Sequence, residues 1–239
     1  MPKSEVLFSR KGTRKSFLEK CILFPFNRLL HLKSKRFLLE NTKQLVIFSF
    51  DHIGHTINLK GLYERENLEV FFYWIESLKI DFSNSIAIDI GANIGNHSIY
   101  FSNFFGSAIS FEPHPRTYKV LLLNAELSKN INCKNIGLSD ANREAPLEEN
   151  PANMGNSFIL EKNTRTAETA NLRTLDSLED FGDVKLIKID TEGHEYKVIA
   201  GARKTIKNNM PIIIFEQSES AFINGETAAI CELKDLGYR

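Results

Sequence analysis

Apolar and polar positions follow a repeating pattern from residue 86 to the end of the chain. Short apolar segments of the kind that form buried strands lie at residues 86–90, 108–112, 135–138, 184–189 and 211–215. Between them, apolar residues recur at the three- and four-residue spacing of helices. Strands that alternate with helices predict an α/β fold: a Rossmann-like, doubly wound and mostly parallel sheet with helices on both faces.

The predicted helices follow the strands. One runs from Gly91 to about Phe105, a second begins near Pro115, and a third carries its apolar residues from Glu195 to Ile206. A short helix is expected at residues 174–178 and a last one at 228–236. The chain is more polar and rich in Asn over residues 141–170, where we expect an excursion with two short strands.

The N-terminal part of the chain has a different pattern. Residues 45–50 and 56–59 flank a His-Ile-Gly turn and predict a β-hairpin, whereas the apolar segment 68–78 predicts a helix. We therefore divide the chain into an N-terminal extension over residues 1–60 and an α/β domain over 61–239.

Charge supports this division, although the whole chain of 239 residues is formally neutral. Residues 1–43 hold eleven basic and three acidic residues, a net charge of +8, and the rest of the chain carries −8. Bases mixed with bulky apolar residues over 10–40 are typical of a helix on an anionic membrane surface, but also of a helical cap with solvated bases. Nucleic-acid binding is the least favoured of the three interpretations, and we expect none.

No run of about 18 apolar residues and no signal-peptide pattern is present. The sequence therefore predicts a cytoplasmic protein, with peripheral contact at the inner membrane face as the alternative that residues 10–40 leave open.

Carboxylates occur at or beside the end of every predicted strand. In an open α/β sheet, ligands bind at the carboxyl ends of the strands, near the point where strand order reverses. A purely structural sheet has no need of acidic residues there, so we expect a ligand site. The acidic residues in question are Asp89, Glu112, Asp140, Asp190, Glu192 and Glu216.

The turn after the first of these strands indicates which ligand fits. Gly91 and Gly95 form a G-x-x-x-G pattern, which differs from the G-x-G-x-x-G of dinucleotide-binding proteins. Asp89 would repel a pyrophosphate, whereas Glu112, 23 residues later, is placed to accept hydrogen bonds from ribose hydroxyls. A ligand with a ribose and a positive charge but no phosphate, such as S-adenosylmethionine, meets these requirements. The structural alternative is a helix cap with glycine for packing.

Five segments carry a wider similarity: IAIDIGANIGNHSIYF, SFEPHP, TLDSL, LIKIDTEGHEYKVIAGA and PIIIFE. Over about residues 60–237 the chain resembles the FkbM-type family of S-adenosylmethionine-dependent methyltransferases. The resemblance implies a class I methyltransferase domain that methylates hydroxyl groups of sugars, glycans or natural products. It also implies cofactor contacts: ribose at Glu112, adenine near Asp140, and the methionine end at Asp89, Gly91, Ala92, Asn93 and Gly95.

The catalytic candidates follow the fourth predicted strand. Methyl transfer from a sulfonium needs alignment, and a base near a weakly nucleophilic hydroxyl helps. We expect Asp190, Glu192 and His194 to act there, although Glu192 would also suit a helix cap and His194 a solvent-facing first turn. Together with Glu216, the two carboxylates would suit a magnesium ion, but we expect no metal. Secondary candidates are His97 and His114.

The end of the sequence raises a further expectation. Methyltransferase folds of this type normally finish with a strand hairpin, which is apparently absent after residue 236. The apolar segment 211–215 would then form an open sheet edge, through which a homo-oligomer is expected to form. The shortened end also leaves open a non-catalytic binding module. A nicotinamide oxidoreductase is a third interpretation, which Asp89 and the glycine spacing disfavour.

Overall fold

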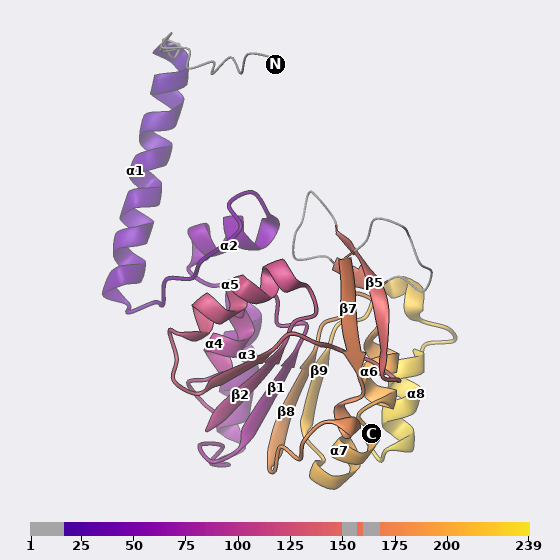
Figure 1. Cartoon of the computed structure of the whole chain (residues 1–239). Helices are drawn as coiled ribbons and strands as arrows, with labels where there is room; N and C mark the ends of the chain where they lie inside the picture. The colour runs from indigo at the N-terminus through magenta and orange to yellow at the C-terminus, as the bar shows by residue number, and fades with distance from the viewer. Residues whose placement is uncertain (1–16, 150–156, 160–167) are drawn as a thin grey trace, which may run out of the picture. The chain divides into compact units, whose positions relative to one another are not determined.

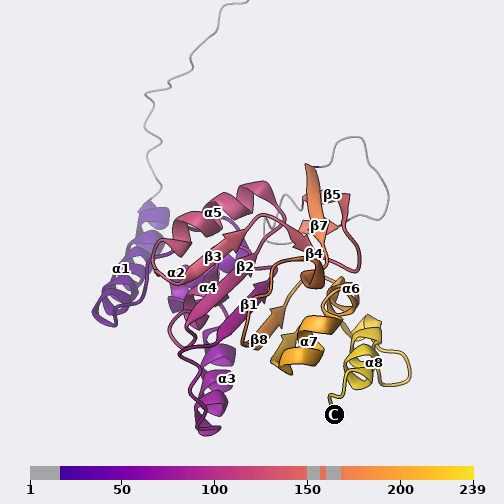
Figure 2. The same cartoon turned by 60° about the horizontal axis from the view of Figure 1, so that its bottom comes forward.

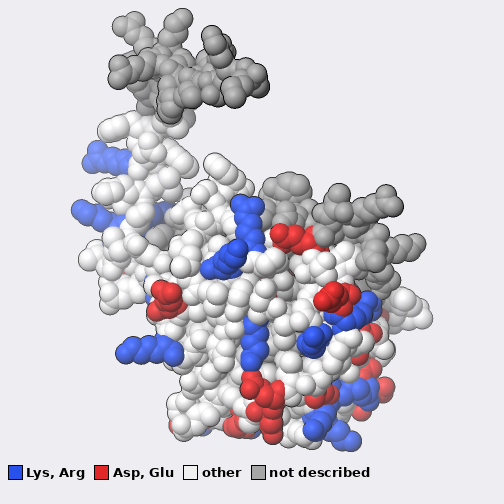
Figure 3. Space-filling model, in the orientation of Figure 1, with Lys and Arg blue, Asp and Glu red and all other residues white. Residues whose placement is uncertain are grey.

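The computed structural model describes residues 17–149, 157–159 and 168–239. The chain forms two compact units, Met1–Thr42 and Lys43–Arg239. The first contains helix α1 (Phe17–Leu39), whose exposed side chains include several bases on the face seen in Figure 3. Among the described helices, none has the length and apolar content needed to cross a bilayer.

A five-stranded parallel sheet forms the centre of the second unit (Figure 1). The strand order is β3-β2-β1-β8-β9, so the order reverses between β1 and β8. This arrangement confirms the predicted Rossmann-like, doubly wound fold. The strands are β1 (Ile86–Ile90), β2 (Ser107–Phe111), β3 (Ile131–Lys134), β8 (Val184–Ile189) and β9 (Ile212–Phe215).

Helices cover both faces of this sheet (Figure 2). One face carries α3 (Arg65–Ser77) and α4 (Asn96–Phe101), whose aromatic residues pack on alternate strand positions such as Ala87 and Leu186. The intervening positions, such as Ile88, face the other side. The helices on that side are α6 (Glu195–Ala200), α7 (Arg203–Asn209) and α8 (Ala228–Asp235). Burial on both faces explains why these strands are almost continuously apolar.

Two of the predicted helices differ from the observed ones. The helix after Gly91 ends at Phe101 instead of about Phe105. The apolar positions from Glu195 to Ile206 belong to two helices, separated by a turn at Gly201 and Ala202. A Cβ on Gly201 would lie 1.9 Å from the Ser139 carbonyl oxygen, so this turn requires glycine. The others are close to expectation: α5 (Pro115–Ala125), the short 3-10 helix η1 (Leu175–Ser177) and α8.

A second, smaller sheet has the order β4-β7-β5-β6. It contains β4 (Gly137–Leu138), β5 (Arg143–Glu149), β6 (Ser157–Ile159) and β7 (Glu168–Arg173). The predicted excursion over 141–170 is thus present, although residues 150–156 and 160–167 lie outside the described residues. The prediction of a main-sheet strand at 135–138 was wrong: residues 131–134 take that place, and Gly137–Leu138 pair with β7.

The predicted hairpin over 45–50 and 56–59 was also wrong. Residues 42–48 form no regular structure, and His52–Lys60 form helix α2. Asp51 starts this helix, since its side chain accepts a hydrogen bond from the Gly54 amide (2.6 Å), and Gly61 ends it in the left-handed conformation (φ 81°). These caps outweigh the strand-like alternation. The division into two compact units falls between Thr42 and Lys43, and a functional boundary near residue 60 stays a prediction.

Candidate functional site

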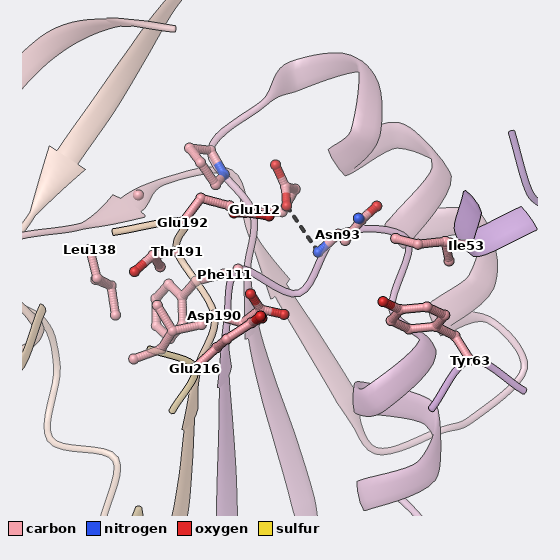
Figure 4. A pocket seen from close by; sticks show the side chains of 14 residues that line it. Ile53, Tyr63, Asn93, Phe111, Glu112, Leu138, Asp190, Thr191, Glu192 and Glu216 are labelled. Atoms are coloured by element: carbon pink, nitrogen blue, oxygen red, sulfur yellow. Dashed lines mark hydrogen bonds between the residues drawn. The ribbon is translucent and has the colours of Figure 1, made fainter. Parts of the chain in front are cut away.

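A pocket opens at the carboxyl ends of the strands, beside the point where strand order reverses. The loops after β1, β2, β8 and β9 contribute to its lining, as do Ile53 of α2 and Tyr63 before α3. Asp190 and Glu216 project into the pocket, and the Tyr63 ring faces them (Figure 4). Five of the predicted site residues line it: Gly91, Asn93, Glu112, Asp190 and Glu192.

The turn after β1 requires glycine for a steric reason. Gly91 has φ +73°, and a Cβ there would lie 1.8 Å from the Asp190 carbonyl oxygen. The loops after β1 and β8 are therefore in backbone contact at the base of the pocket. Gly95 (φ +88°) begins α4, and a Cβ there would lie 2.7 Å from the Leu121 side chain. Ala92 is buried, and neither it nor Gly95 is part of the lining.

Glu112 joins the ends of β1 and β2. Its Oε2 accepts a hydrogen bond from the Asn93 amide (2.9 Å), and its Oε1 accepts one from the His114 amide (2.8 Å). Burial raises the pKa of Glu112 to about 7 and outweighs the two hydrogen bonds, which lower it. The carboxyl group is therefore fixed in position and titrates near neutral pH.

Asp89 does not line the pocket, and its predicted role at the methionine end of the cofactor stays a prediction. It is fully buried, and Ser98 donates a hydrogen bond to its Oδ2 (2.5 Å). Lys188 Nζ lies 3.5 Å from Asp89 Oδ1 and 3.1 Å from Asp190 Oδ2. Burial lowers the pKa of Lys188, but Asp89 and Asp190 outweigh burial and raise it above its usual value. Asp89 thus supports the site from below, through a buried ammonium group that orients Asp190.

The loop after β8 is held by a residue that the sequence did not single out. Glu195 is buried, and its Oε1 accepts hydrogen bonds from the amides of Thr191 (3.2 Å) and Gly193 (2.9 Å). This leaves Glu192 exposed with a left-handed backbone (φ 52°) at the rim of the pocket. Partial desolvation of the Glu192 carboxyl is the main cause that raises its pKa, and the negative charges of Asp190 and Glu216 raise it further.

Two predicted site residues lie elsewhere. His194 is buried outside the lining, with Nε2 2.9 Å from Ser139 Oγ, and burial lowers its pKa to about 4. His194 thus lies beside Ser139 and away from the pocket lining, and its role as proton acceptor stays a prediction. Asp140 is exposed and accepts a hydrogen bond from Ser139 (2.9 Å). It does not line the pocket either.

The two secondary histidines differ in their surroundings. His114 is fully buried, precedes α5 as its cap, and places Nε2 3.5 Å from Glu168. His97, on α4, places Nε2 3.1 Å from Oε2 of Glu64, a residue just before α3. The family resemblance includes the segment GLYERENL, but the sequence did not single out Tyr63 or Glu64 within it, because the strand pattern does not point to residues more than 20 positions before β1.

Among the described residues, no group of three or more His, Cys, Asp or Glu side chains is arranged to hold a metal ion.

Comparison with known proteins identifies the family. Residues 89–239 match the model of the methyltransferase FkbM domain. The chain belongs to the FkbM methyltransferase family. This match includes the glycine turn, Glu112 and the loop after β8, so most of the pocket lining lies inside the family domain, whereas Ile53 and Tyr63 precede it. The resemblance that the sequence segments indicated is confirmed.

Curated relatives of this FkbM-family chain are methyltransferases. The methyltransferase sdnD of Sordaria araneosa is 26% identical over 194 residues, which cover 65% of this chain and 74% of sdnD. The hexuronic acid methyltransferase AglP of Haloferax volcanii is 28% identical over 131 residues, 53% of each chain. A solved precorrin-6y C5,15-methyltransferase from Geobacter metallireducens aligns with a TM-score of 0.44 and 16% identity over 75% of each chain.

Proposed function

We propose that this FkbM-family chain transfers a methyl group from S-adenosylmethionine to a hydroxyl group of a sugar, a glycan or a natural-product intermediate. The observation that carries the proposal is the pocket at the strand-order reversal, framed by the Gly91 turn and by the buried Glu112. In a parallel α/β sheet this is the place where a nucleoside-containing ligand binds.

The residues present fit S-adenosylmethionine. Within the described part of the chain, Asn93 Oδ1 is buried and has no hydrogen-bond partner, so it is free to accept one from an amino group. Glu112 would hold the ribose hydroxyls, and the carboxylates of Asp190, Glu192 and Glu216 would favour the positively charged methionine end. When bound, S-adenosylmethionine supplies a methyl group activated by its sulfonium.

The same lining argues against a dinucleotide. None of the described residues that line the pocket is Lys or Arg. The phosphates of NAD would face Asp190, Glu192 and Glu216 without a basic side chain in the lining to balance them. A cofactor without phosphates meets no such repulsion.

The chain's own residues align the acceptor with the methyl group and place carboxylates near its hydroxyl. Asp190 lines the pocket, and Lys188 at 3.1 Å orients its carboxylate toward the place where an acceptor hydroxyl must approach. Glu192 at the rim is a further predicted catalytic carboxylate. Oxygen as the methylated atom is supported by carboxylates that can accept hydroxyl hydrogen bonds, and by AglP, a relative that is named for methylating a hexuronic acid.

The test is transfer of an isotope-labelled methyl group from S-adenosylmethionine to methyl glycosides, with the products identified by mass spectrometry. We expect an ether product that survives mild alkali. Alkali-labile label, as in the methyl ester of a carboxyl group, or label on an amino group alone, would contradict methylation of a hydroxyl group. If S-adenosylhomocysteine binds and no glycoside or hydroxylated natural product is methylated, a non-catalytic binding module becomes the better account.

A further inference from the structure

A second cavity adjoins the pocket on the α3 and α4 side of the sheet. It shares Asp190 and Glu216 with the pocket, so the two spaces adjoin at the ends of β8 and β9. Glu64, His97 and Lys188 supply its remaining charged or titratable lining. A substrate in this cavity would therefore approach a cofactor in the pocket past Asp190.

The floor of the second cavity is apolar. Leu68 and Phe71 of α3, Phe101 of α4 and Ile214 of β9 line it. Apolar lining with a few polar groups at one end is the usual form of a small-molecule site, because burial gives affinity and the polar groups set orientation. Here the polar groups gather at the end next to the pocket.

The charges at that end are mainly negative. Lys188 is the only Lys or Arg among the described residues that line the second cavity, and it already pairs with Asp89 and Asp190. Burial raises the pKa of Glu216, and the charges of Asp190 and Glu64 raise it further. An anion at this end would meet repulsion, whereas a neutral or cationic group would not.

Glu64 and His97 form a closely paired unit in this lining. Their Oε2 and Nε2 atoms lie 3.1 Å apart, and the His97 side chain is only 11% exposed. The hydrogen bond from His97 is the largest influence on Glu64 and holds the pKa of that carboxyl below its usual value. An ionised carboxylate beside an imidazole stabilises the imidazolium that forms when the ring accepts a proton.

We propose that the second cavity receives the methyl acceptor, that the acceptor carries no negative charge beside its reacting hydroxyl, and that the Glu64–His97 pair takes up the hydroxyl proton. The inference rests on the proposed function, since the methyl group must arrive from the adjoining pocket. The acceptor oxygen bonds to the methyl carbon as the carbon–sulfur bond breaks and its electron pair goes to sulfur. Because His97 Nε2 already donates to Glu64, the hydroxyl proton passes to His97 Nδ1, and the ring becomes an imidazolium paired with Glu64.

Acceptor charge is tested by saturation-transfer NMR on the full chain loaded with S-adenosylhomocysteine. The probes are the methyl glycosides of glucose, glucosamine and glucuronic acid. We expect saturation transfer from the protein to the methyl glycosides of glucose and glucosamine, and no transfer to the methyl glycoside of glucuronic acid. Binding of the glucuronide as strongly as of the glucoside would overturn the charge argument, and saturation of no probe would overturn the cavity assignment.

The pair is tested by steady-state kinetics with whichever probe is methylated. His97→Asn and Glu64→Gln should each lower kcat by about 10²–10⁴ while KM and S-adenosylhomocysteine affinity stay unchanged. The matched controls are His55→Asn and Glu66→Gln, two exposed residues on α2 and α3, which should behave as wild type. Wild-type kcat in either pair variant would overturn the proposal, as would a loss confined to KM.

A measurement of cofactor binding distinguishes failure of this proposal from failure of the proposed function. If wild type fails to bind S-adenosylhomocysteine, the proposed function fails and the pair falls with it. If wild type binds and methylates, but the pair variants remain fully active, only the inference about Glu64 and His97 is wrong.

Discussion

The ionisation of Glu112 leads to a prediction about pH. Its carboxyl group is fixed by the amides of Asn93 and His114, and burial raises its pKa to about 7. A carboxylate accepts two ribose hydroxyls, whereas the protonated acid has lost part of that capacity. S-adenosylhomocysteine should therefore bind more tightly as pH rises through 7.

The size of the effect follows from the titration. With a pKa of about 7, about one tenth of the chains carry an ionised Glu112 at pH 6 and about nine tenths at pH 8. The dissociation constant should accordingly fall about tenfold between pH 6 and pH 8, which is about 1.4 kcal/mol. Titration calorimetry at pH 6, 7 and 8 measures this change directly.

Folding stability should change in the opposite direction. In the unfolded chain Glu112 has its ordinary pKa of 4.5, so between pH 4.5 and 7 the folded chain binds more protons than the unfolded chain. The contribution of Glu112 to the free energy of unfolding is therefore largest below pH 4.5. It falls by about 3 kcal/mol as pH rises through 7.

Two variants show whether Glu112 is the group responsible. Glu112→Gln should bind S-adenosylhomocysteine more weakly, by about 1.5–3 kcal/mol, and with little change between pH 6 and 8. Glu216→Gln removes another carboxylate whose pKa is raised and should keep the tenfold dependence. A dissociation constant of the wild type that does not change with pH, or a pH dependence that survives in Glu112→Gln, would refute the reasoning.

Three further predictions concern the frame of the site and the N-terminal segment. Lys188→Met leaves Asp89 buried without its cation and should lower the free energy of unfolding by about 3–5 kcal/mol in urea titrations; an unchanged midpoint would contradict this. Gly91→Ala should lose S-adenosylhomocysteine binding, whereas Gly182→Ala, also at positive φ but with open space around its Cβ, should cost about 1–2 kcal/mol and keep binding. Equal effects of the two would show that steric contact at Gly91 is unimportant. Residues 10–40 should retain the chain on phosphatidylserine vesicles and release it in high salt; no sedimentation with these vesicles would exclude the membrane surface.

Strand positions could be predicted best from the sequence where a single physical cause, such as burial of both strand faces, determines the apolar pattern. The segments at 86–90 and 184–189 are apolar because both faces of a central parallel strand are buried, and both were placed correctly. Residues 131–134 have little apolar content because β3 lies at the edge of the sheet, and the adjacent segment 135–138 was chosen instead.

Secondary structure was harder to predict for short segments whose sequence fits both a strand and a helix. Residues 52–60 satisfy both a strand alternation and a helix, and the Asp51 cap decides between them through one hydrogen bond. The carboxylates at strand ends were found from the sequence because the topology gathers them. Which of them enter the pocket depends on side-chain direction at single positions: Asp89 points to Lys188 on the adjacent strand, and Asp190 lines the pocket.

The most direct test of the central claim is a thermal melt of the chain with saturating S-adenosylhomocysteine, compared with NADH. At about 100 times the dissociation constant, a ligand that binds only the folded chain adds about 2.7 kcal/mol of stability. We predict a clear rise in Tm with S-adenosylhomocysteine and none with NADH. A cooperative melt that S-adenosylhomocysteine leaves unmoved would contradict the assignment of the pocket.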